Sequence, residues 1–412
     1  MPDCFKYLEK LVSFHTMSDV APETDMPNAP LIHWAAERFA GFGFSTRVIE
    51  SSRGKLNLFA WSGPMTGRGP DERGGLLLSG HTDTVGCDPA LWTSDPWTLT
   101  PRDGRVYGLG SCDMKGFLAC AMAFAEKLSA ARIVPQQGLG ILLTCDEETS
   151  MQGARTAAPV LAEMGVAPAL AVVGEPTELT PIFGHKGYMA RSVEIAGRAC
   201  HSSNPTLGVN AVKTAADVIE ALTALEERLK GSVDPDFDHP DAPEVPYPTL
   251  NIGSIRGGDS VNRVCSSVRL EFDVRPTPSH PAEKVRDELD ALEAELNRRH
   301  PGGVKVSALY PDLDPFGNSD PDVRRMVERI AAVKGEFVSY ATEASFLQRL
   351  GPTVVMGPGS IRQAHGVDEF CAVSELEGCM GLLEKLFLRC GGASASRMRS
   401  ENFLSGGMPR SD

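Results

Sequence analysis

In this 412-residue sequence, five acidic residues and two histidines follow apolar segments or directly precede a helical one. They are His81, Asp83, Asp113, Glu147, Glu148, Glu175 and His365. Imidazole nitrogens and carboxylate oxygens are ligands that zinc, cobalt and manganese accept in proteins. Such a group could hold divalent metal ions, and a carboxylate that is not a ligand could act as a general base.

Each of these residues also has an ordinary structural explanation. A lone His81 is more often a hydrogen-bonded core histidine than a ligand, and Asp113 could simply cap the helix that follows it. The acids at 146–148 could form a solvated loop or the start of a helix. Together, however, four or five carboxylates in one cleft would repel each other strongly without a cation. We therefore favour a site for two metal ions that share one bridging carboxylate.

The segments that carry these residues predict an α/β fold. Four apolar runs have the length, and the lack of alternation, of strands buried on both faces. They lie at 75–80, 139–145, 169–174 and 353–357. Helical stretches such as 114–131 and 153–164 separate them, an order typical of a largely parallel sheet. Because the carboxyl ends of parallel strands meet at one edge, we expect the residues that follow them to converge.

A different pattern interrupts the first one in the middle of the chain. Strand-like and helical stretches follow each other there in the order βαββαβ, which is the ferredoxin-like arrangement. They lie at 188–195, 209–229, 249–255, 267–275, 281–299 and 304–309. We expect a discontinuous catalytic domain of residues 1–184 and 312–391, an inserted domain of residues 185–311, and a disordered tail at 392–412.

Composition argues against several kinds of partner. The sequence has 40 basic and 54 acidic residues, and the net charge of −14 disfavours nucleic acid and anionic membranes. Its longest apolar stretch, 117–125, is about half of what a membrane span needs. The first residues show no targeting signal, so we expect a soluble, cytoplasmic protein. The 10 cysteines contain no CxxC pair, which favours reduced thiols.

Several motifs, in this order, resemble those of the zinc amidohydrolase family that includes aminoacylase and succinyl-diaminopimelate desuccinylase. They are Ser79-Gly-His-Thr-Asp-Thr84, Gly108-Leu-Gly-Ser-Cys-Asp-Met-Lys-Gly116, Asp146-Glu-Glu-Thr-Ser150, Gly174-Glu-Pro-Thr177, and Gly357-Pro-Gly-Ser360 ahead of His365. The likeness covers nearly all of residues 1–390. One departure is Val85-Gly86, where the family usually has Val-Pro, and it should alter only the loop after the first ligand.

The resemblance implies a dinuclear zinc centre, in which cobalt could replace zinc. His81, Asp113 and Glu175 would hold one zinc ion. Asp113 would bridge to a second zinc ion, held also by Glu148 and His365. Metal ions in such a site lower the pKa of water and polarise an amide carbonyl.

Two further residues gain roles from the same resemblance. Asp83 would hydrogen-bond the far nitrogen of His81 and so fix its tautomer. Glu147 would be the general base, taking a proton from water and returning it to the departing amine.

The inserted domain would complete the site. Asn262 and Arg275 resemble the family's substrate-carboxylate binders, although pattern alone would favour a surface ion pair for Arg275. His201 resembles the histidine that stabilises the tetrahedral oxyanion. In dimeric members of the family this histidine reaches the other subunit's active site, so the resemblance implies a homodimer.

The expected activity is metal-dependent hydrolysis of a small N-acyl amino acid. The motifs match best those of members that convert N2-acetyl-L-ornithine to L-ornithine and acetate in arginine biosynthesis. Glu343 could then bind the δ-ammonium group of the substrate, or it could be an exposed loop residue. Other N-acyl amino acids, succinylated diamino acids and dipeptides remain alternatives, as do a non-catalytic metal- or peptide-binding relative and a structural protein with an acidic groove. Glu147 speaks against a pure binding module, which needs no spare base.

Overall fold

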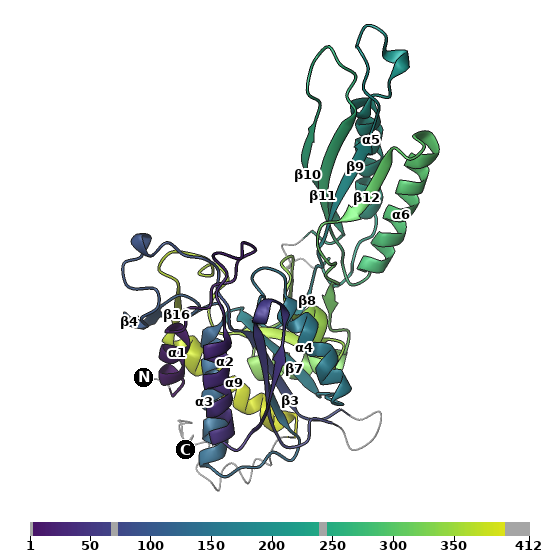
Figure 1. The fold of residues 1–412 in the computed structure, drawn as a ribbon. Coiled ribbons are helices and arrows are strands. Elements are labelled where there is room, and N and C mark those ends of the chain that lie inside the picture. The colour runs from purple at the N-terminus through teal and green to yellow at the C-terminus, as the bar shows by residue number, and fades with distance from the viewer. Residues whose placement is uncertain (1–2, 67–72, 239–244, 392–412) are drawn as a thin grey trace. The chain divides into compact units, whose positions relative to one another are not determined.

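The computed structural model describes residues 3–66, 73–238 and 245–391. The tail at 392–412, which we expected to be disordered, lies outside the described residues. The chain forms two compact units. The first comprises Met1–Phe183, Asn318–Glu336 and Thr342–Asp412, and the second comprises Gly184–Gly317 and Phe337–Ala341 (Figure 1). The sequence did not suggest the short return of the chain to the second unit at 337–341.

A mixed β-sheet has most of its strands in the first unit, and its middle strands are parallel. The order is β1-β2-β6-β3-β7-β15-β8-β13, and β14 pairs with β8. The strands are β1 (Ser45–Glu50), β2 (Leu56–Ser62), β3 (Leu76–His81), β6 (Leu139–Thr144), β7 (Leu170–Pro176), β8 (Ile182–His185), β13 (Phe316–Gly317), β14 (Glu336–Val338) and β15 (Thr353–Gly357). The chain passes into the second unit within β8.

The four predicted runs are the four parallel strands of this sheet. Strands β6, β3, β7 and β15 pair in parallel, and every residue in them is buried. The predicted α/β fold with a largely parallel centre is therefore confirmed. Strands β1 and β2 continue the sheet in antiparallel fashion and were not predicted. In β1 only Ile49 is buried, so the strand carries almost no apolar signal.

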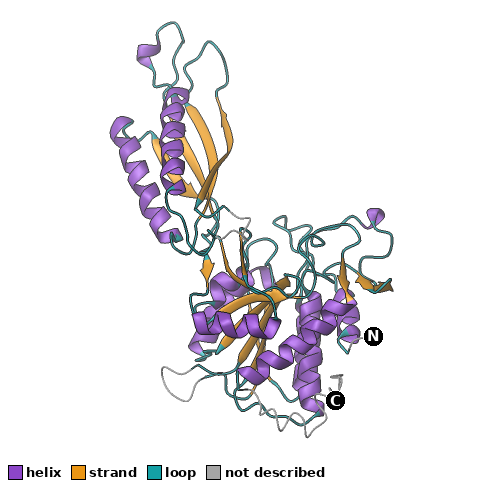
Figure 2. Cartoon of the chain, turned by 180° about the vertical axis from the view of Figure 1, so that it is seen from behind, coloured by secondary structure: helices purple, strands orange, loops and turns teal. Residues whose placement is uncertain are grey.

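Helices cover both sides of this sheet, with α2 and α3 on one side and α4 on the other (Figures 1 and 2). The helices of the first unit are α1 (Phe5–Val12), α2 (Ala29–Gly41), α3 (Lys115–Ala130), α4 (Gln152–Glu163), α7 (Pro321–Ala331), α8 (Ala344–Leu347) and α9 (Val373–Arg389). Helix α3 is buried continuously from Lys115 to Ala125 and packs against α1 and α9. A small separate sheet has the order β16-β5-β4, formed by β16 (Phe370–Ala372), β5 (Arg105–Tyr107) and β4 (Thr100–Arg102).

The second unit is a two-layer domain with the predicted βαββαβ order. Its elements are β9 (Met189–Ala196), α5 (Ala211–Lys230), β10 (Thr249–Gly257), β11 (Ser267–Arg275), α6 (Ala282–Arg299) and β12 (Val304–Ala308). The antiparallel sheet has the order β10-β11-β9-β12, so β10 and β12 are its edges. Apolar side chains of α5 and α6 form one core with this sheet. None of the helices in the described part of the chain is long and apolar enough to cross a membrane.

Candidate active site

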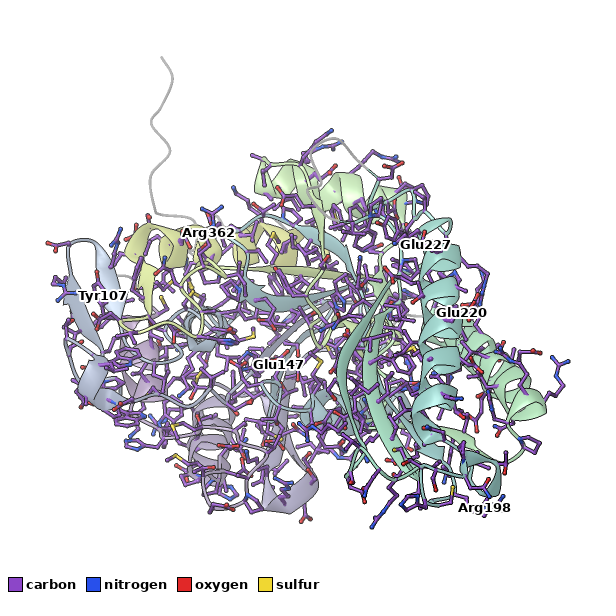
Figure 3. The ribbon with its side chains drawn as sticks, turned by 90° about the horizontal axis from the view of Figure 1, so that it is seen from above. Tyr107, Glu147, Arg198, Glu220, Glu227 and Arg362 are labelled. Carbon is purple, nitrogen blue, oxygen red and sulfur yellow. The ribbon has the colours of Figure 1, made fainter. Side chains whose placement is uncertain are left out.

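The parallel strands bring the predicted residues to one edge of the central sheet. His81 is the last residue of β3 and is paired with Thr144, the last residue of β6. The acidic loop after β6 therefore starts beside His81. Glu175 lies at the end of β7, which pairs with β3 on its other side. Figure 3 labels Glu147, which lies among the side chains in the middle of that view.

Asp113 lies between the two predicted histidine ligands. Its Oδ1 is 3.0 Å from Nε2 of His81, and its Oδ2 is 3.5 Å from Nε2 of His365. Nε2 of His365 is also 2.9 Å from Oε2 of Glu148. The two oxygens of one carboxylate thus face two different histidines, which is the arrangement that a bridging ligand requires.

Three overlapping groups of side chains offer potential ligand atoms that all lie within 4.8 Å of one another. They are His81 with Asp113 and Glu175, Asp113 with Glu148 and His365, and His81 with Glu147 and Glu148. The first two groups are the sets named from the sequence. The third group includes Glu147, so distance alone does not separate the expected base from the ligands.

Burial makes this concentration of carboxylates unfavourable unless cations balance it. Burial and the neighbouring charge of Glu175 raise the pKa of Glu147 well above its usual value. Burial and the charge of Asp113 do the same to the pKa of Glu175. Burial also opposes ionisation of Asp113, but hydrogen bonds with His365 and His81 lower its pKa below the usual range. Hydrogen bonds with Asp113 and Glu148 raise the pKa of His365 to about 10.

The donor groups fit a divalent metal ion. They combine two imidazoles with several carboxylates, which is a ligand set typical of zinc and its neighbours. Oε1 of Glu175 is buried and has no hydrogen-bond partner among the described residues. A buried carboxylate oxygen without a partner is costly, and a metal ion in the group with His81 and Asp113 would compensate it.

The expected hydrogen bond from Nδ1 of His81 to the Asp83 carboxylate is not formed. Nδ1 of His81 instead pairs with the backbone carbonyl oxygen of Asp83 at 3.0 Å, and the nearest carboxylate oxygen is 3.7 Å away. The physical reason lies in the other carboxylate oxygen, Oδ2, which accepts hydrogen bonds from the Ser18 hydroxyl and the Glu148 amide. Asp83 therefore orients His81 through its main chain and holds the Glu148 loop through its side chain.

A buried lysine under the acidic loop was missed by the sequence analysis. Nζ of Lys55 is 2.6 Å from Oδ1 of Asp146, 2.5 Å from Oδ1 of Asp25 and 3.2 Å from the Ser18 hydroxyl. Asp146 adopts a left-handed backbone conformation, with φ of 58°. This conformation is uncommon outside glycine, and the contacts to Lys55 help to hold it where the loop turns toward the site. A single lysine ahead of an apolar strand carries no recognisable signal.

Glu343 is fully buried, so the exposed-loop interpretation of this residue is wrong. It immediately precedes α8, and its Oε2 accepts a hydrogen bond of 2.8 Å from the hydroxyl of Thr144. Its Oε1 has no hydrogen-bond partner among the described residues. Burial raises the pKa of Glu343 to about 7. Thr144 ends the strand that leads to Glu147, so Glu343 lies beneath the acidic loop.

The residues expected from the inserted domain are divided between two ends of the second unit. His201 and Asn262 line one hollow, together with Cys200 and Arg263. Arg275 ends β11, at the end of the strand away from Asn262. Strand β11 spans roughly 26 Å at about 3.3 Å per residue. Within this unit, therefore, Asn262 and Arg275 cannot contact the same carboxylate.

Comparison with known proteins agrees with the fold. The model of peptidase family M20/M25/M40 matches residues 77–389. The chain is 38% identical to an acetylornithine deacetylase of Pasteurella multocida (strain Pm70), over 94% of this chain and 97% of that one. It is 39% identical to an acetylornithine deacetylase of Proteus mirabilis (strain HI4320), over 94% and 96%.

Solved structures resemble the whole chain as well. A tripeptidase from Staphylococcus aureus subsp. aureus Mu50 has a TM-score of 0.68 at 18% identity, covering 94% of this chain and 98% of that one. A Bacillus subtilis protein described as a dinuclear metal binding peptidase from the M20 family has a TM-score of 0.63 at 14% identity, covering 94% and 97%. At such identities the likeness shows the fold alone.

The fold and the ligand groups define a metal-dependent hydrolase whose chain forms two compact units. The chain belongs to peptidase family M20/M25/M40. The family resemblance seen in the sequence motifs is thus confirmed, and it supports a divalent metal ion at this site.

The Lys55 network leads to a prediction about stability. Lys55→Met keeps a long side chain but leaves Asp25 and Asp146 buried without their cation, which should cost about 3–5 kcal/mol of unfolding free energy. Lys6→Met removes an exposed pair with Glu126 and is the matched control, with an expected cost of at most about 1 kcal/mol. Urea unfolding of the metal-free proteins measures both values. Equal costs for the two variants would contradict a structural role for the network.

Proposed function

We propose that the chain is a deacetylase that hydrolyses N2-acetyl-L-ornithine to L-ornithine and acetate, acting in the cytoplasm in arginine biosynthesis. Metal-dependent hydrolysis is supported above all by the position of the Asp113 carboxylate. One of its oxygens faces His81 and the other faces His365, so it belongs to two ligand groups, and Glu147 lies beside them. The relatives named acetylornithine deacetylase, 38–39% identical over 94% of the chain, support the substrate.

Two zinc ions per chain are part of this proposal, and cobalt should be able to replace them. His81, Asp113 and Glu175 would hold one ion, and Asp113, Glu148 and His365 would hold the other. When bound, the ions would polarise the substrate carbonyl and make water a stronger nucleophile near neutral pH.

Glu147 would transfer the proton that the reaction moves. Its carboxylate accepts a proton from water as the water oxygen bonds to the carbonyl carbon of the substrate. The same proton then passes to the amide nitrogen, and the C–N bond breaks to release acetate and the free amine.

Arg275 would bind the α-carboxylate of the substrate. Its Nε donates a hydrogen bond of 3.0 Å to Asp273, and its guanidinium lies over the ring of Tyr188 at 4.3 Å from the centroid. These contacts fix the plane of the guanidinium. A guanidinium held in this way matches a carboxylate in a two-pronged geometry that lysine cannot copy.

His201 and Asn262 would act on the substrate bound by a second copy of the chain. Nδ1 of His201 is hydrogen-bonded to the Ser203 hydroxyl at 2.7 Å, so Nε2 is the nitrogen that can face an oxyanion. Both residues lie at the end of β11 opposite Arg275, too far for one chain to bring all three to one substrate. A homodimer resolves this separation, because each site would combine Arg275 of one chain with His201 and Asn262 of the other.

The surface near this end of the second unit suits an interface between two chains. Strand β10 is an edge of its sheet, and unpaired edges readily pair with another chain. Large apolar side chains are exposed on β10 and on the neighbouring loops. They are Leu207, Val209, Ile255 and Val261.

Glu343 would recognise the δ-ammonium group of ornithine. The support is a fully buried carboxylate with one oxygen lacking a partner among the described residues, beneath the loop that carries Glu147. A substrate cation close to Oε1 would favour the ionised form that burial disfavours.

The substrate proposal is tested by a panel of acyl compounds, in the unaltered protein and in Glu343→Gln. The panel compares N-acetyl-ornithine, uncharged N-acetyl-norvaline, a succinylated diamino acid and a dipeptide. We expect kcat/KM to be highest for N-acetyl-ornithine, and Glu343→Gln to lose mainly the preference over N-acetyl-norvaline. A higher value for the dipeptide would contradict the substrate. An equal loss on both acetyl compounds would show that Glu343 supports the structure of the site and does not bind the amine.

Substitution of the two adjacent glutamates should separate the base from a ligand. Glu147→Gln should keep both metal ions and lower turnover by roughly 10²–10⁴, the usual effect of losing a general base. Glu148→Gln should lower the occupancy of one ion. Elemental analysis and steady-state kinetics on the same preparations distinguish the two. Near-normal turnover of Glu147→Gln would exclude this residue as the base.

Mixing two inactive variants tests the shared site. His201→Ala and Glu147→Gln should each be nearly inactive as homodimers. If His201 serves the partner chain, a mixed dimer contains one site with both native residues, and part of the activity should return on subunit exchange. Exchange is checked with differently tagged chains. Confirmed exchange without recovery would mean that His201 acts within its own chain or has no role.

A further inference from the structure

The loop that carries Asp113 is held by a buried carboxylate with no part in the mechanism above. Residues 108–114 connect β5 to α3, and all of them are buried. Buried backbone amides need acceptors, and a loop has no ladder of its own to supply them. Four of the six amides from Gly108 to Asp113 bond to Glu369, which lies far away in the sequence, and the other two bond to backbone carbonyl oxygens.

Glu369 accepts three backbone hydrogen bonds with its side chain. Oε2 accepts from the amide of Gly110 at 2.8 Å, and Oε1 accepts from the amides of Cys112 at 2.8 Å and Asp113 at 3.0 Å. The residue is 2% exposed. Its carbonyl oxygen also accepts a hydrogen bond of 3.0 Å from the amide of Gly108. One residue therefore fixes the loop from its beginning to Asp113 itself.

The position of Glu369 also ties the loop to the segment of the second histidine. Glu369 follows His365 by one short loop and directly precedes β16. Strand β16 pairs with β5, with Phe370 opposite Tyr107, and Figure 3 labels Tyr107. The segment that bears His365 is thus held to the loop that bears Asp113 by the side chain of Glu369 and by the pairing of β16 with β5.

The chemistry of these contacts requires a carboxylate. Both oxygens of an ionised carboxylate accept hydrogen bonds, and bonds to a charged acceptor are stronger than neutral ones. A glutamine of the same shape would turn one NH₂ group toward a backbone N–H. A shorter aspartate could not reach all three amides from the same backbone position.

We propose that Glu369 is a positioning residue for the metal centre, which sets the main chain of Asp113 so that its two oxygens face His81 and His365. This inference rests on the proposed metal site. In the described part of the chain, the Glu369 carboxylate is hydrogen-bonded to backbone amides and not to a ligand side chain, so it would act on the ligands through the backbone of the Asp113 loop.

The test compares Glu369→Gln with Asp234→Asn in the full-length protein. Asp234 is a matched control, because it is also 2% exposed and accepts hydrogen bonds from the backbone amides of Asp236 and Ser279, but in the second unit. Zinc affinity of the metal-free proteins is measured by competition with a chromophoric chelator. Glu369→Gln should bind zinc about 10–100-fold more weakly, and Asp234→Asn should bind it as the unaltered protein does.

A spectroscopic measurement separates positioning from general stability. The visible absorption bands of cobalt bound to Glu369→Gln should differ from those of the unaltered protein, because the ligand geometry has changed. A folded Glu369→Gln with unaltered zinc affinity and cobalt bands would overturn the inference, even if its thermal stability were lower. Failure of the unaltered protein to bind zinc would overturn the proposed function, and this inference with it.

Two further measurements cover a Glu369→Gln protein that does not fold. Glu369→Asp keeps the charge and should also weaken zinc binding, so a folded Glu369→Asp with native affinity would contradict the role. In the unaltered, metal-free protein, the amides of Gly110, Cys112 and Asp113 should exchange hydrogen slowly with solvent. Rapid exchange of these amides would show that Glu369 does not hold the loop.

Discussion

Mutual repulsion among buried and half-buried carboxylates is the constraint on which the architecture of the first unit depends. Asp113, Glu147, Glu148 and Glu175 meet at one sheet edge, and burial alone opposes the ionisation of each of them. Like charges that lie close together repel each other strongly wherever water is excluded. The two histidines offset part of this charge, and divalent cations would offset the rest. A site of this kind stays assembled only if the surrounding structure holds its members in place.

The strands and two polar contacts supply that support. Strands β3, β6 and β7 are buried along their whole length, so the apolar core fixes where His81, the acidic loop and Glu175 emerge. Lys55 then holds the loop at Asp146 from below. Glu369 holds the loop of Asp113 by three backbone amides. The site is therefore built from a rigid sheet edge together with two loops that buried charged residues immobilise.

The strands and the residues that follow them could be predicted from the sequence, because both depend on local pattern. Apolar runs without alternation gave the four parallel strands, and the parallel sheet gave the convergence of the residues after them. The supporting contacts could not be predicted, because they join residues far apart in the chain. Cys112 and Glu369 are separated by 257 positions, and neither residue type indicates such a bond. The hydrogen bond of His81 was assigned to the wrong atom of Asp83, since a sequence does not show that Ser18 and Glu148 bond to Oδ2 and that the backbone carbonyl of Asp83 faces His81.

The wide separation of Asn262 from Arg275 in the second unit follows from the strand that lies between them. Asn262 and Arg275 are close in sequence, but an extended strand separates its ends as far as a polypeptide can. The prediction that both bind one carboxylate therefore conflicts with the predicted strand between them, unless two chains share the site. The alternation of β11, with Val268, Leu270, Phe272 and Val274 buried, was visible in the sequence and contained this information.

The most direct test of the metal centre is a crystal structure of the zinc-loaded protein with anomalous data on both sides of the zinc absorption edge. We expect two anomalous peaks in each chain. One should be bound by His81, Asp113 and Glu175, and the other by Asp113, Glu148 and His365, with Glu147 bound to neither. A single peak, or a zinc ion bound by Glu147 in place of Glu148, would contradict this expectation.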